Sequence, residues 1–111
     1  MKNQYNKLVR DGIPINIERD GLAYKARELD AVTFRSELLK KLVEEANEVA
    51  NAASISDVVE ELADLQEVIS AILQSFEIEE EEIEAARLKK FEKNGGFEKK
   101  IFLEFVETPK Q

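Results

Sequence analysis

Two pairs of carboxylates near the middle of the chain have the residue type and spacing of a metal site. Glu45 and Glu48 are three residues apart in one helical pattern, and Glu61 and Asp64 are three apart in the next. Side chains at this spacing are neighbours on a helix that advances about 100° per residue. Glu45 and Glu61 fall within the apolar faces of their helices, where a carboxylate is costly to desolvate. A divalent cation between two antiparallel helices would neutralise all four charges.

A second interpretation stays open for each pair taken alone. Acidic residues three or four apart on a helix usually form a solvated face, and the chain would then be a plain acidic bundle without a metal. The composition limits the metal ions that such a site could bind, because the chain has no histidine and no cysteine. Oxygen ligands alone favour Mg²⁺, or Mn²⁺, over zinc. The same absences exclude disulfides, histidine-based acid–base catalysis and the usual serine triad.

The helices that must position these carboxylates follow from the spacing of apolar residues. Apolar side chains recur every three or four residues from about residue 31 to 53, which predicts a long helix. Ser54 or Ser56 can cap a second helix that runs to about Phe76. An antiparallel hairpin of these two helices would bring the carboxylate pairs face to face.

Shorter elements flank this hairpin. Pro14 favours a helix over residues 13–19, and a third helix is expected over residues 79–93. Residues 23–29 and 101–106 could form strands and pair with each other. The expected fold is therefore mostly α, a helical-hairpin bundle with room for a small two-stranded β ribbon.

The composition is that of a globular, acidic chain. Hydrophobic residues make up 43% and charged residues 36% of its 111 positions, and the formal net charge is −8. We expect one domain spanning residues 1–111. A nucleic acid polymer is not an expected partner, because phosphate contacts need clustered Lys and Arg. No apolar run is long enough to cross a membrane, and residues 1–12 lack the apolar stretch of a signal peptide, so we expect a cytoplasmic protein.

Four segments carry a family resemblance. KLVEEANEV (41–49) followed by EELADLQEV (60–68) resembles the paired acidic motif, EExxE and then ExxD, of the all-α nucleotide pyrophosphohydrolases. That family includes MazG-type enzymes, phosphoribosyl-ATP pyrophosphohydrolase, and the dimeric dUTP and dCTP pyrophosphatases. YNKLVRDGIP (5–14) and GGFEKKIFLEF (95–105) are similar to a small MazG-like subgroup. The resemblance covers nearly the whole chain.

The resemblance implies a reaction, in which a nucleoside triphosphate is cleaved between its α and β phosphates. The products would be a nucleoside monophosphate and pyrophosphate, and the role would be house-cleaning of non-canonical nucleotides. Glu44 and Glu45 would be catalytic, with Glu44 orienting or deprotonating the attacking water and Lys41 approaching the phosphates. The implied Mg²⁺ ligands are Glu45, Glu48, Glu61 and Asp64.

Other basic residues are candidates for phosphate contacts. Arg10 could donate to a phosphate, but a structural tether between Arg10 and an aspartate is an equal alternative. Lys90 and Lys93 could clamp phosphates, or could simply complement the dipole at the end of their helix. Gly95–Gly96 could stop that helix or shape a nucleotide loop, and Phe97 could contact a base.

The sequence is also compatible with other functions. Hydrolysis of phosphoribosyl-ATP is the less favoured alternative, because the two end segments are more similar to the MazG-like subgroup. A non-catalytic regulatory or assembly module that keeps the fold is a further alternative, although the complete set of four ligands argues against it. We also expect a homodimer or homotetramer, because one hairpin and a third helix cannot enclose a four-sided bundle.

Overall fold

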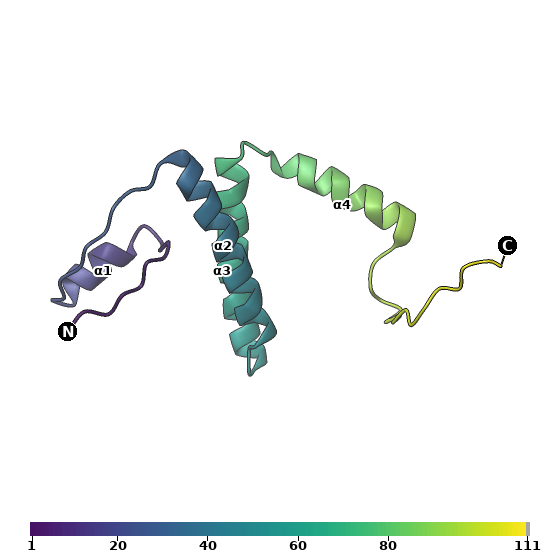
Figure 1. Ribbon diagram of the computed structural model, residues 1–111, viewed down its shortest axis with the longest axis horizontal. Coiled ribbons are helices and arrows are strands. Elements are labelled where there is room, and N and C mark those ends of the chain that lie inside the picture. The colour runs from purple at the N-terminus through teal and green to yellow at the C-terminus, as the bar shows by residue number, and fades with distance from the viewer. Residues whose placement is uncertain (111) are drawn as a thin grey trace. The chain divides into compact units, whose positions relative to one another are not determined.

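A computed structural model describes residues 1–110 of the chain. Figure 1 shows the helices of these residues, joined by irregular segments. The chain divides into two compact units, Met1–Ile78 and a second unit that begins at Glu79. The first unit contains α1 (Ile13–Arg19), α2 (Ala31–Ala50) and α3 (Ile55–Ser75), and the second contains α4 (Glu80–Asn94).

The predicted mostly-α fold is confirmed, since helices are the regular elements of residues 1–110. The small two-stranded β ribbon that was considered from the sequence is absent from residues 1–110, since neither 23–29 nor 101–106 forms a strand. An extended segment keeps strand geometry when a neighbouring strand takes up its backbone hydrogen bonds and one face is buried. Residues 101–106 are exposed throughout, so the alternation of apolar side chains in this segment does not correspond to a buried face.

Helices α2 and α3 form an antiparallel hairpin, in which they lie side by side (Figure 1). Arg35, in the second turn of α2, donates from Nε to the Ser75 carbonyl oxygen at 3.0 Å, at the far end of α3. The same guanidinium lies 5.5 Å from the centroid of the Phe76 ring. A short connection over residues 51–54 joins the other ends of the two helices. The hairpin is therefore closed at both ends.

The core of the hairpin is small. Among the described residues, the buried apolar side chains are Leu38, which is 2% exposed, and Val68, which is 8% exposed. Many large apolar side chains on the two helices remain exposed, among them Leu39, Val43, Val59 and Leu62. No helix in residues 1–110 combines the length and the apolar character needed to span a bilayer.

Side-chain caps define where α2 and α3 begin. The Asp30 carboxylate accepts a hydrogen bond from the Thr33 backbone N–H at 2.7 Å, which lowers the pKa of Asp30. The Ser54 hydroxyl accepts one from the Asp57 backbone N–H at 3.1 Å. Each bond satisfies an amide that has no partner inside its helix. Of the two serines considered from the sequence, Ser54 is thus the cap.

The cap at Ser54 leads to a stability prediction. Ser54→Ala is expected to lower the free energy of unfolding by about 1 kcal/mol, because the Asp57 amide loses its acceptor. Ser56→Ala is the matched control, since Ser56 is exposed within the first turn of α3. Urea denaturation of both variants measures the difference. Equal destabilisation by the two substitutions would contradict the capping role.

Candidate metal centre

Three of the predicted ligands come together between α2 and α3. Glu45 projects from α2, and Glu61 and Asp64 project from α3. Each offers a carboxylate oxygen that lies within 4.8 Å of the oxygens of the other two. Glu45 is buried, at 8% exposed, while the other two are partly buried. The structure therefore gathers one carboxylate from the first predicted pair and both from the second.

The burial of this cluster follows from helical spacing. Glu45 comes seven residues after the buried Leu38, and Glu61 comes seven residues before the buried Val68. Seven residues make nearly two turns, so each glutamate shares a face with the core residue of its own helix. The packing that buries Leu38 and Val68 thus also draws Glu45 and Glu61 towards each other.

The cluster is electrostatically unfavourable for Glu61. Burial raises the pKa of the Glu61 carboxyl, and the negative charges of Glu48, Asp64 and Glu45 raise it further. Glu48 is exposed and is not one of the three clustered carboxylates, yet its charge acts on Glu61 more strongly than those of the other two. Glu48 therefore lies beside the cluster, and its role as a fourth ligand stays a prediction.

Lysines partly compensate the carboxylates on the α2 side. Lys41 Nζ lies 3.6 Å from a Glu44 oxygen and 3.7 Å from a Glu45 oxygen, one turn along the same helix. Lys7 Nζ lies 3.5 Å from the same Glu44 oxygen. Sequence reasoning noted Lys7 only as part of the N-terminal motif. No spacing signal pointed to this contact, because residues 1–10 contain no helix or strand that would fix the direction of the Lys7 side chain.

Arg10 reaches the cluster itself. Its Nη2 atom donates to Asp64 Oδ1 at 2.7 Å, with both side chains partly open to solvent. Of the two alternatives that the sequence left for Arg10, the structure contains the aspartate tether. A phosphate contact by Arg10 stays a prediction.

The cations of α4 belong to the second unit. Lys90 and Lys93 are exposed, and Lys93 lies in the last turn. Glutamates occupy the first turn, and Glu79 and Glu82 form a capping box there. This distribution of charge complements the helix dipole. Arg87 forms a bidentate ion pair with Glu84, at 3.0 and 2.6 Å, so it is already engaged within the helix.

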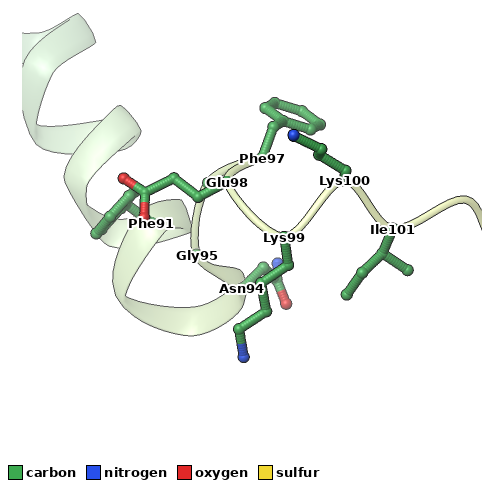
Figure 2. Close-up of a pocket in the computed structure, with 9 residues that line it drawn as sticks. Phe91, Asn94, Gly95, Phe97, Glu98, Lys99, Lys100 and Ile101 are labelled. Carbon is green, nitrogen blue, oxygen red and sulfur yellow. The ribbon is translucent and has the colours of Figure 1, made fainter.

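The segment after α4 forms a shallow pocket of about 540 Å³ around Gly95 and Gly96. Gly95 ends the helix with a φ of 78°, and its N–H donates to the Phe91 carbonyl oxygen. At Gly96 an added Cβ would lie 3.2 Å from the Phe91 ring, so a larger residue there would have to displace that ring slightly. Figure 2 shows Phe97 and Lys100 on one side of the loop, and Phe97 is 98% exposed. The glycines thus act as a helix stop, and a nucleotide contact by this loop stays a prediction.

The donor set of the three clustered carboxylates fits a hard divalent cation. All donors are carboxylate oxygens, the preferred ligands of Mg²⁺ and Mn²⁺. A cation would also relieve the mutual repulsion that raises the pKa of Glu61. The neighbouring lysines and Arg10 supply donors of the kind that bind phosphate oxygens. Carboxylates that can bind a cation and basic groups that can bind an anion therefore lie next to each other at this site.

No protein-family model, curated protein or solved structure matches the chain. The link to the all-α nucleotide pyrophosphohydrolases consequently rests on the motif residues quoted above.

Proposed function

We propose that this chain is a Mg²⁺-dependent nucleoside triphosphate pyrophosphohydrolase. It would cleave between the α and β phosphates and release a nucleoside monophosphate and pyrophosphate. One observation carries the proposal: Glu45, Glu61 and Asp64 hold carboxylate oxygens within 4.8 Å of one another at the hairpin interface. So many like charges in a partly desolvated place are unfavourable unless they serve a cation.

The residues around the cluster have separable roles in this proposal. Glu45, Glu61 and Asp64 would hold the ion, with Glu48 as a further ligand from the exposed side. A bound Mg²⁺ supplies charge neutralisation for the triphosphate and lowers the pKa of a nearby water. Glu44 would orient that water and accept its proton.

Basic side chains around the cluster support a phosphate-containing substrate, which a bundle that only binds a metal would not need. Lys41 lies between Glu44 and Glu45, and Arg10 lies against Asp64, so positive and negative groups alternate around one site. Catalysis of phosphoryl transfer depends on positioning and on charge stabilisation by such groups. Lys41 and Arg10 would bind phosphate oxygens, while Lys90 and Lys93 remain further candidates.

The proposal predicts pyrophosphate release that requires a divalent cation. We expect release from at least one member of a panel of canonical, deoxy and oxidised nucleoside triphosphates in millimolar Mg²⁺, and none with a chelator. The melting temperature should also rise on adding Mg²⁺, because a ligand of the native state alone stabilises it. A Mg²⁺-induced rise without release from any nucleotide would favour a non-catalytic module. The absence of both effects would favour the plain acidic bundle.

The panel also addresses the biological role. We propose house-cleaning of non-canonical nucleotides in the cytoplasm, so damaged or deoxy substrates should be preferred over the four canonical ribonucleotides. Phosphoribosyl-ATP belongs in the panel as the alternative substrate. Preference is measured as the ratio of kcat/KM values.

We further propose that the protein works as a homodimer or homotetramer. The exposed apolar side chains of the hairpin include Leu39, Val43 and Leu62, and the hairpin buries only Leu38 and Val68 as apolar core. Apolar surface of this extent on a small chain is typical of an interface between subunits. A second hairpin packed on this one would complete a four-helix bundle.

A further inference from the structure

Arg10 makes an ion pair that conflicts with the proposed use of its partner. Its Nη2 atom lies 2.7 Å from Asp64 Oδ1, and Asp64 is one of the three clustered carboxylates. A guanidinium and a divalent cation that lie against the same few carboxylates repel each other, so each weakens the attraction of the other to Asp64. The Arg10–Asp64 pair therefore competes with a divalent cation for the charge of Asp64.

The segment that carries Arg10 is lightly attached. Residues 1–10 contain no helix or strand, and the Arg10 carbonyl oxygen accepts a hydrogen bond from the Ile13 N–H at the start of α1. Among the described residues, the ion pairs that join this segment to the hairpin are Lys7–Glu44 at 3.5 Å and Arg10–Asp64. The Arg10 and Asp64 side chains are 56% and 44% exposed, so their pair is weak and open to exchange.

We propose that Arg10 is an exchangeable counter-ion that occupies Asp64 in the metal-free protein and leaves it when a divalent cation binds. Residues 1–10 are then released from α3, while Lys41 stays on Glu44 and Glu45 because it belongs to α2 itself. The inference rests on the proposed function, since it takes the carboxylate cluster as a metal site.

The exchange follows from charge and from ligand chemistry. A divalent cation brings twice the charge of a guanidinium to the same carboxylates, and it accepts oxygen lone pairs directly. The guanidinium has only N–H donors, so it cannot bind the metal and must find another anion. The phosphate oxygens of a metal-bound substrate are such an anion, and they match the planar fork of arginine. Arg10 would thus neutralise Asp64 before a cation binds and contact the substrate afterwards.

Metal binding to Arg10→Gln is the first test, measured by calorimetric titration with Mn²⁺ in the absence of nucleotide. The matched control is Arg19→Gln, which removes the same charge from the exposed end of α1. Arg19 makes no ion pair with another residue in the range 1–110. We expect Arg10→Gln to bind Mn²⁺ about two- to fivefold more tightly than Arg19→Gln, as the loss of one exposed competing pair implies.

The second test follows the segment directly. The chain has no cysteine, so Gln4→Cys provides one site for a nitroxide label. Saturating Mg²⁺, which is diamagnetic, should sharpen the electron paramagnetic resonance spectrum of the label as the segment is released. With Arg10→Gln in the same chain, the label should already be mobile without Mg²⁺ and should respond less.

The outcomes separate this inference from the proposed function. If the protein binds no Mn²⁺, both fall. If it binds Mn²⁺ but the two arginine variants bind it equally well, only the exchange of Arg10 is refuted. A label whose motion is unchanged by saturating Mg²⁺ refutes it as well.

Discussion

Glu61→Gln is expected to abolish pyrophosphate release, by at least about a hundredfold, and also to raise the melting temperature of the metal-free protein. Activity is lost because a neutral amide is a poor replacement for a carboxylate ligand. Even mutation of a residue that only hydrogen-bonds to a metal ligand typically lowers metal affinity or activity about ten- to a hundredfold. The gain in stability follows because Glu61 is repelled by Glu48, Asp64 and Glu45 in the folded state. Substitution of a residue that serves function at a cost in stability should lower activity and raise stability together.

The pH dependence of stability follows from the sign of the pKa shift. The folded-state pKa of Glu61 lies above its unfolded value, so the folded protein holds this proton more tightly. The destabilisation by Glu61 is therefore absent below the unfolded-state pKa and fully present above the folded-state pKa. In metal-free buffer, stability should fall as pH rises through this window, and the Glu61→Gln variant should lose that component.

Glu67→Gln is the control for both effects, because Glu67 is exposed on the same helix and lies outside the clustered carboxylates. We expect this variant to keep its activity and to melt close to the parent chain. Thermal melts with a chelator and with Mg²⁺ complete the comparison. Full turnover by Glu61→Gln in saturating Mg²⁺ would remove Glu61 from the metal site.

Leu38→Ala is expected to destabilise the protein by about 2–5 kcal/mol, the usual cost of emptying a buried leucine site. Leu38 is 2% exposed and is the most deeply buried of the described apolar residues. With so small a core, that loss is a large part of the total stability of a small domain. Urea denaturation at low protein concentration measures the effect.

The neighbouring residue provides the control. Leu39 is 46% exposed, so Leu39→Ala should cost much less than Leu38→Ala in a dilute sample. If a second copy covers this face, the cost of Leu39→Ala should grow as protein concentration rises. Equal costs at the lowest concentration would contradict the deeper burial of Leu38 relative to Leu39.

Much of the fold could be predicted because its signals are local. Helix α1 covers the residues 13–19 that were expected from Pro14, and Ser54 caps α3. Helix α2 ends at Ala50, somewhat earlier than its apolar pattern suggests, and the backbone N–H and side-chain amide of Asn51 both donate to the Asn47 carbonyl oxygen at this end. Residues 101–106 have a strand-like pattern but no strand, since pairing depends on a partner that local sequence does not reveal.

The site was predictable as far as helical geometry reaches. Glu45 is buried and Glu61 is partly buried, in agreement with the positions predicted for them on the apolar faces. Spacing along one helix does not decide which way a long side chain turns, so it did not separate Glu48 from the cluster. The partners of Lys7 and Arg10 could not be predicted either, because they depend on the path of a segment without regular structure.

The short connection over residues 51–54 has a kinetic consequence. Closing so small a loop is fast and costs little chain entropy, so α2 and α3 can pair early as the chain folds. The oxygens of Glu45, Glu61 and Asp64 all lie on this one hairpin. The chain can therefore assemble its carboxylate cluster early in folding, and a divalent cation bound there, as proposed, would stabilise the hairpin as soon as it forms.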